Sequence, residues 1–218
     1  MKKQRFFALL LLILLTSIYP SKNILSSKFD LKKIDITNNT ILSDKEIKKH
    51  LHSIYNKNLI LLNSKEIEVA LRQNSFIEGF NIKKKYPNTL KIKVFEKKPI
   101  VILMNKKNKY YLSDKIDLIE FKNLQKYNDL PYVFGNKNDF KILYKKLNKI
   151  NFPLGIIKKY TFFESNRWDI ETTDKKLIKL PTNNYTKSLQ NYLELRNGND
   201  FKKYTIFDYR INNQIILK

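Results

Sequence analysis

The side chains that could support catalysis or bind a metal are few and scattered in this 218-residue sequence. His50 and His52 lie two positions apart in a predicted helix, so they point to different faces and do not form a metal-binding pair. Asp114 and Asp117 could act as paired carboxylates, but their stretch is typical of a turn, where aspartate is common. Cysteine is absent, which excludes disulfides and thiolate chemistry. We therefore predict no catalytic residue, no metal site and no cofactor.

Phosphate-binding and acyl-enzyme motifs are missing as well. The glycines at 79, 135, 155 and 198 are isolated, so no glycine-rich loop can surround a phosphate. No serine is followed three positions later by lysine, as a penicillin-binding type of nucleophile requires. A function in binding other proteins is the remaining broad class.

The basic composition raises nucleic-acid binding as an alternative. Lys and Arg number 43 against 20 Asp and Glu, which gives a formal net charge of +23. The lysines are spread along every segment, and no aromatic stacking motif interleaves them. A solvated, lysine-rich surface accounts for the charge better, so we predict no nucleic-acid partner.

The N-terminus has the pattern of a membrane-directed segment. Basic residues at 2, 3 and 5 precede an apolar run that starts at Phe6 and reaches Tyr19. A cleaved signal peptide is the alternative, but no small-x-small cleavage site follows, and Ile24 and Leu25 can extend the run if Lys22 snorkels to the interface. We predict a cytoplasmic tail at 1–5 and a transmembrane helix at 6–25, containing Phe6, Leu10, Leu15 and Tyr19. The basic tail places the bulk of the chain outside the cytoplasmic membrane.

Two helices and three strands are predicted after this segment. Residues 29–36 have a strand pattern, and Ser43-Asp44-Lys45-Glu46 fits a capping box that starts a helix. Asn63-Ser64-Lys65-Glu66 repeats the signal for a second helix. Strands at 76–86 and 90–94 form a hairpin through Pro87-Asn88-Thr89. The predicted order is β-α-α-β-β.

The texture changes after Lys97-Lys98-Pro99, where we place a domain boundary. Helical spacing of apolar residues predicts helices at 138–150 and 185–193, and Trp168 is expected in the core. Residues 205–217 form either a strand pair or one long strand. Short strands are predicted at 100–104, 109–112, 118–121, 160–163, 168–171 and 177–180. A second, larger α+β domain is the natural interpretation.

These motifs, in this order, resemble the bacterial cell-division family FtsQ, called DivIB in Gram-positive lineages. In that family a hairpin with the pattern P-x-T-L-x-I-x-V-x-E-x-x-P closes the POTRA domain, and residues 87–99 match it. Leu130–Gly135, Arg167–Ile170, Leu180-Pro181 and Phe207–Arg210 are similar to motifs of the family's β domain, and their spacing is most like the alphaproteobacterial branch. Ser113–Asp117 departs from the family by lacking a glycine.

The resemblance implies an α+β protein with a transmembrane helix, a POTRA domain at 28–98 and a β domain with a C-terminal edge strand at 99–218. It implies a bitopic scaffold of the cell-division complex at the septum of the cell inner membrane, which links early septal proteins to septal peptidoglycan synthesis. FtsB–FtsL-type division proteins are the implied partners, without a small-molecule substrate. The alternatives are a membrane-anchored cell-wall enzyme and a POTRA-bearing secretion or outer-membrane assembly component.

β-Augmentation is the predicted mode of binding, because the last strand to join a sheet often lies at its edge. With a period of two, Tyr209, Ile211, Asn213 and Ile215 would share one face of that strand. These four residues and Arg210 are the candidate partner-binding residues. The alternative is a strand that lies inside the sheet and is purely structural.

Overall fold

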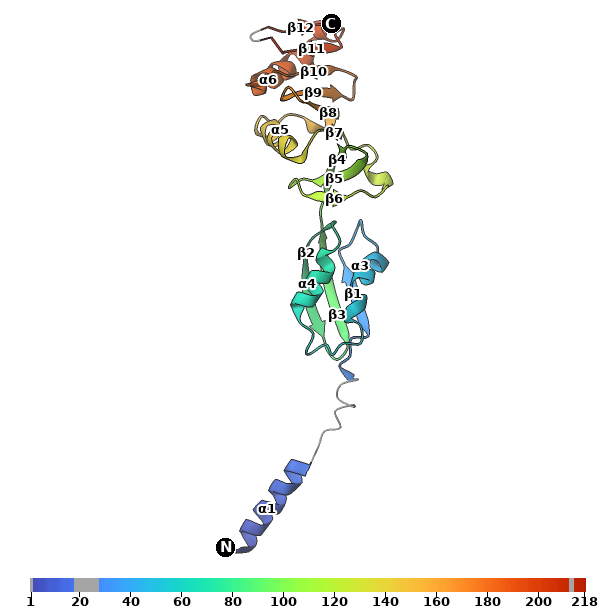
Figure 1. The fold of residues 1–218 in the computed structure, drawn as a ribbon, viewed down its shortest axis with the longest axis vertical. Helices are drawn as coiled ribbons and strands as arrows, with labels where there is room; N and C mark the ends of the chain where they lie inside the picture. The colour runs from blue at the N-terminus through green and yellow to red at the C-terminus, as the bar shows by residue number, and fades with distance from the viewer. Residues whose placement is uncertain (1, 18–27, 212–213) are drawn as a thin grey trace. The chain divides into compact units, whose positions relative to one another are not determined.

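The computed structural model describes residues 2–17, 28–211 and 214–218. The chain divides into two compact units, Met1–Glu96 and Lys97–Lys218. Figure 1 shows the helices and strands of each unit.

The N-terminal helix α1 spans Lys2–Ser17 and includes Phe6, Leu10 and Leu15. Within the described ranges, no helix has both the length and the apolar character needed to cross a membrane. The predicted transmembrane helix at 6–25 continues into residues 18–27, and these, Tyr19 among them, lie outside the described residues.

The rest of the first unit has the predicted β-α-α-β-β order. Its elements are β1 (Lys33–Thr37), α3 (Asp44–His50), the short 3-10 helix η1 (His52–Ile54), α4 (Ser64–Arg72), β2 (Ile77–Lys85) and β3 (Thr89–Glu96). The sheet order is β1-β3-β2, with β1 parallel and β2 antiparallel to β3. Alternate residues such as Ile34, Ile92 and Val94 are buried, so one face of this sheet carries the core.

Both predicted helix starts are present, but only one has the reciprocal cap. The Ser43 side chain accepts the Glu46 N–H, and the Glu46 carboxylate accepts the Ser43 N–H, which confirms the first capping box. At α4 the Asn63 side chain caps the Lys65 N–H. The predicted second capping box is wrong, because the Glu66 carboxylate binds the Lys57 ammonium at 2.6 Å and does not bond back to the helix start.

Glu96, the last residue of β3, holds the loop between β1 and α3. Its Oε2 atom accepts the Thr40 N–H, the Thr40 hydroxyl and the Ile41 N–H, each at 2.8 Å, and its Oε1 atom accepts the Leu42 N–H at 2.8 Å. Asn38 donates from its side chain to the Val94 carbonyl in the same region. One carboxylate therefore supplies partners for three backbone donors of a turn.

The second unit is built on a nine-stranded sheet in the order β12-β11-β10-β9-β8-β7-β4-β5-β6. Its strands are β4 (Pro99–Asn105), β5 (Asn108–Ser113), β6 (Leu118–Glu120), β7 (Tyr132–Phe134), β8 (Ile157–Phe163), β9 (Arg167–Thr172), β10 (Leu177–Lys179), β11 (Ile206–Asp208) and β12 (Ile216–Leu217). Its helices are α5 (Lys137–Lys149), α6 (Tyr185–Arg196) and the 3-10 turns η2 (Gln125–Tyr127), η3 (Leu154–Ile156) and η4 (Asn199–Phe201).

The strand β7 was not predicted, although it joins the two halves of the sheet by pairing in parallel with both β4 and β8. Helix α5 connects β7 to β8, and α6 connects β10 to the parallel β11. Both crossovers advance the sheet in the same direction, so the right-handed rule places both helices on one face. Figure 1 shows α5 and α6 on the same side of the strands.

Aromatic side chains fill the space between this sheet and α5. Trp168 is buried, as predicted, with its ring 4.9 Å from that of Phe162 and 6.4 Å from that of Phe140. Gly135, directly after β7, passes close to this group. A Cβ atom there would lie 2.9 Å from the Phe162 Cβ and 3.3 Å from the Trp168 Cη2. The core requires glycine at this position because there is no space for a methyl group.

Candidate partner-binding edge

The C-terminal hairpin of β11 and β12 closes one end of the large sheet. The Lys218 N–H donates to the Ile206 carbonyl at 3.1 Å, and the Lys218 carbonyl accepts the Ile206 N–H at 2.9 Å. In an antiparallel pair such two-way bonds recur at every second residue, so the N–H and C=O of Leu217 point away from β11. No strand of the described residues pairs with this outer side, because β12 is the last strand in the sheet order.

The prediction of a continuous strand face over the candidate residues is wrong. Residues 205–217 contain a strand pair, one of the two predicted alternatives, and the described residues 209–211, 214 and 215 belong to neither strand. Tyr209 is buried whereas Ile211 is half exposed, so the two do not share an orientation. Ile215 is partly buried against the core, and Asn213 lies outside the described residues.

A side-chain turn explains why the strand stops after Asp208. The Arg210 guanidinium binds both carboxylate oxygens of Asp208, with Nε at 2.8 and 3.0 Å and Nη2 at 2.6 Å, and the Arg210 N–H also donates to Oδ1. The Asp208 side chain thus bonds to the backbone N–H and the side chain of the residue two positions on, a local turn that competes with continuation of the strand. Arg210 is thus held by its own chain, and 46% of its side chain remains exposed.

The buried carboxylates beside this turn have opposite pKa shifts. Hydrogen bonds from Arg210 lower the pKa of Asp208. Burial raises the pKa of Asp169, and the Arg167 guanidinium, 3.3 Å away, partly offsets this rise. Lys179 stands between the two aspartates in the strand register, opposite both Asp169 and Asp208. Negative, positive and negative side chains therefore alternate across β9, β10 and β11.

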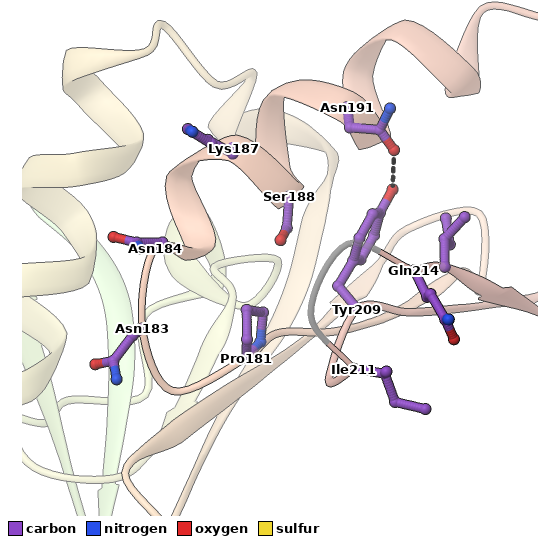
Figure 2. A pocket seen from close by; sticks show the side chains of 10 residues that line it. Pro181, Asn183, Asn184, Lys187, Ser188, Asn191, Tyr209, Ile211 and Gln214 are labelled. Atoms are coloured by element: carbon purple, nitrogen blue, oxygen red, sulfur yellow. Dashed lines mark hydrogen bonds between the residues drawn. The ribbon is translucent and has the colours of Figure 1, made fainter.

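Tyr209 ties the loop between β11 and β12 to helix α6. Its hydroxyl donates to the Asn191 side-chain carbonyl at 3.1 Å (Figure 2). Burial raises the pKa of this phenol, so Tyr209 stays neutral and keeps its donor proton at all physiological pH values. Tyr209 is 7% exposed and helps to position the loop, and its role as a residue that a partner contacts stays a prediction.

A hollow of about 560 Å³ lies between the N-terminal half of α6 and this loop. Figure 2 shows Ser188 and Asn191 of α6 directed toward the loop that carries Tyr209, Ile211 and Gln214, whereas Lys187 points away from it. The hollow is lined by Pro181, Asn183, Asn184, Lys187, Ser188, Asn191, Tyr209, Ile211, Gln214 and Ile215. Amide and hydroxyl groups dominate this set, and they can both donate to and accept from a peptide backbone.

The sequence analysis missed the α6 side of this hollow. The motif Leu180-Pro181 and the polar run that follows it were seen only as the approach to a helix. The available signal was the concentration of asparagine around the helix start. Asn184 takes the left-handed conformation at φ 54° there, which asparagine tolerates better than most residues.

The two histidines line the same surface hollow, although they were expected to point to different faces of one helix. His50 ends α3 and His52 begins η1, and both line a surface hollow beside α4. The described residues hold no group of three or more His, Cys, Asp or Glu side chains that could bind a metal ion.

Comparison with known proteins bears on the first unit directly. Residues 29–97 match the family model of the POTRA domain, FtsQ-type. This segment is an FtsQ-type POTRA domain. The match covers β1 to β3, including the Glu96 carboxylate and the loop that it holds.

The similarity to FtsQ extends over nearly the whole chain. The chain is 26% identical over 208 residues to cell division protein FtsQ of Rickettsia bellii (strain RML369-C), covering 93% of this chain and 76% of that protein. It is 25% identical over 218 residues to FtsQ of Rickettsia felis (strain ATCC VR-1525 / URRWXCal2), covering 98% and 80%. For FtsQ of Rickettsia conorii (strain ATCC VR-613 / Malish 7) the identity is 25%, with 94% and 77% covered. The predicted resemblance to FtsQ, including its alphaproteobacterial branch, is confirmed.

Proposed function

We propose that this chain is a bitopic scaffold of the cell-division complex, and that it binds a partner strand along the outer side of β12. The observation that carries the proposal is the position of β12 as the last strand of the sheet, with the backbone of Leu217 directed outward. An added strand would receive hydrogen bonds from these groups and complete the sheet.

The surroundings of β12 supply specificity to such a strand. Ile216 is 39% exposed and Ile211 is 50% exposed, so both offer apolar contact area beside the outer side of β12. The hollow beneath α6 offers amide groups to the residues of the partner that precede or follow its strand. The resemblance to FtsQ indicates FtsB of an FtsB–FtsL-type pair as this partner.

The remaining parts of the proposal follow from the same family. Residues 1–5 are the cytoplasmic tail, 6–25 the transmembrane helix, 28–98 the POTRA domain and 99–218 the FtsQ-type β domain. The protein lies in the cell inner membrane at the septum, with its bulk in the periplasm, and links early septal proteins to septal peptidoglycan synthesis. It has no catalytic activity of its own.

Two substitutions of Leu217 test the β12 edge, because one removes its backbone N–H and the other only shortens its side chain. Leu217→Pro removes the outward N–H, and proline is tolerated at an edge strand when its nitrogen faces solvent. The loss of about 1–2 kcal/mol of backbone hydrogen bonding should weaken binding of the FtsB-type partner by about 5- to 30-fold in a pull-down. Leu217→Ala keeps the N–H and should retain most of the binding.

Equal binding by Leu217→Pro and the parent chain would show that the interface does not lie on β12.

Ile211→Lys tests the loop beside the outer side of β12 and should reduce binding if the partner crosses this loop. A peptidoglycan turnover assay on the purified protein tests the absence of catalysis, since bond cleavage or glycan polymerisation would contradict the scaffold role.

A further inference from the structure

The FtsQ-type POTRA domain presents an apolar tip in the connection between η1 and α4. Leu59 and Leu62 are buried, while the two residues between them face solvent. Ile60 is 50% exposed and Leu61 is 82% exposed. Two adjacent large apolar side chains are thus directed into water at the turn of a loop.

The exposure of this tip is built into the loop by hydrogen bonds. The Asn58 side-chain carbonyl accepts the Ile60 N–H at 3.0 Å and the Leu61 N–H at 3.4 Å. From β2, the Lys84 ammonium donates to the Ile60 carbonyl at 3.2 Å and to the Leu62 carbonyl at 2.7 Å. These bonds hold the backbone in the one conformation that points Leu61 outward, so the tip does not fold onto the core.

The tip lies beside the residues where the chain enters the domain. The Leu59 N–H donates to the Phe29 carbonyl at 2.8 Å, and the Leu31 N–H donates to the Lys57 carbonyl at 2.9 Å. The Phe29 ring meets Tyr86 edge to face at 6.3 Å, and Tyr86 is 55% exposed. Ile60, Leu61 and Tyr86 therefore stand at the same end of the domain as its first residues.

Lysines surround these apolar residues. Lys28, Lys32 and Lys85 are exposed at this end. On the open face of the sheet, Lys83 and Lys91 are direct cross-strand partners, although like charges opposite each other destabilise a sheet. An anionic partner would relieve that repulsion.

We propose that this end of the POTRA domain, consisting of Ile60, Leu61, Tyr86 and the lysines at 28, 32 and 85, docks on the surface of a bilayer that contains anionic lipids. The inference rests on the membrane attachment in the proposed function. Residues 18–27 separate α1 from Lys28, so this end lies within about 40 Å of the end of α1 along the chain. Apolar side chains enter the headgroup region, tyrosine occupies the interface, and lysines bind anionic headgroups.

The absence of cysteine makes the docking measurable in the full-length chain. Leu61→Cys is labelled with the environment-sensitive dye NBD and reconstituted into vesicles of phosphatidylcholine alone or of phosphatidylcholine with phosphatidylglycerol. Val69→Cys is the matched control, because Val69 is 64% exposed in α4 of the same domain. Vesicle flotation records attachment, and doxyl-labelled lipids record contact of the dye with the bilayer.

The expected result is a blue shift and lipid quenching at position 61 in the anionic vesicles, with neither change at position 69. Reversing Lys32 and Lys85 to Glu should reduce the quenching at 61, since each lysine at an anionic surface contributes about fivefold to binding. Chains that float while positions 61 and 69 respond alike would overturn the docking and leave the anchor intact. A blue shift at 61 without lipid quenching would overturn the docking, because the dye would then be shielded by protein and not by the bilayer. If the chain does not float with the vesicles, both the membrane anchor and the docking are contradicted, whereas the proposed β12 interface is unaffected.

Discussion

Replacing Glu96 by glutamine tests whether one carboxylate organises the start of the POTRA domain. The parent side chain accepts four hydrogen bonds, three of them from the backbone of residues 40–42. A glutamine amide keeps one oxygen and places an NH2 group where the second oxygen stood. That NH2 group faces an N–H donor, so at least one backbone donor loses its partner in either orientation of the amide.

The size of the effect follows from this count. A hydrogen bond to a charged group contributes about 1.5–3 kcal/mol, and the bonds that remain to the neutral amide are roughly half as strong. Thr40 is exposed, so water compensates for part of the loss there. We expect Glu96→Gln to destabilise the loop at 38–42 by about 2 kcal/mol, which corresponds to about a 30-fold change in its opening equilibrium.

Amide hydrogen exchange resolves this loop from the rest of the chain. Exchange at Ile41 and Leu42 should become about 30-fold faster in Glu96→Gln, while the second unit exchanges as in the parent. Glu164→Gln, an exposed carboxylate in the turn after β8, is the matched control and should change stability by less than about 0.5 kcal/mol. Exchange at residues 41 and 42 within threefold of the parent would refute the assignment of the loop to Glu96.

The second unit offers three further tests. Gly135→Ala should lower the free energy of unfolding by about 1–3 kcal/mol, since its Cβ would overlap Phe162, and Trp168 fluorescence during thermal unfolding measures the change. Gly155→Ala is the control and should be nearly neutral, because no atom lies within 4 Å of its Cβ. Asp208→Asn should lower the free energy of unfolding in urea by about 1 kcal/mol at pH 7. The pKa of Asp208 is lowered in the folded chain, so its ionised form stabilises the fold above the unfolded pKa near 3.9, and this contribution is lost as pH falls through the folded pKa. A difference independent of pH would argue against the Arg210 pair. Tyr209→Phe removes the hydroxyl that donates to Asn191 and should cost about 1 kcal/mol in the same assay, with faster amide exchange at Gln214 if the bond holds the loop.

Local order was predictable because it depends on neighbours in sequence. The Ser43 capping box, the β-α-α-β-β order and the hairpin around Pro87 were each expected from a few adjacent residues, and each is present. The equally short strands β6 and β10 were predicted, whereas β7 was interpreted only as part of the Leu130–Gly135 motif. Its existence depends on β4 and β8, which hold it from both sides.

The candidate edge shows the same division more sharply. Alternation at 209–215 suggested one face of a strand, but the Asp208–Arg210 pair and the Tyr209–Asn191 bond turn the backbone and bury the tyrosine. A periodic pattern does not reveal a side-chain bond that interrupts a strand. Nor does it reveal that Asn191 of α6, 18 residues before Tyr209 in sequence, is in contact with it. Those facts required the tertiary structure.

The sequence alone was enough to predict most of the elements and their order, the membrane-directed N-terminal pattern and the resemblance to FtsQ, because composition, spacing and caps act between residues close along the chain. Only the folded chain decided which strand ends the sheet, which side of β12 faces outward, and which four donors gather on Glu96. These depend on contacts between residues far apart in sequence, whose pairing is chosen by the packing of the whole unit.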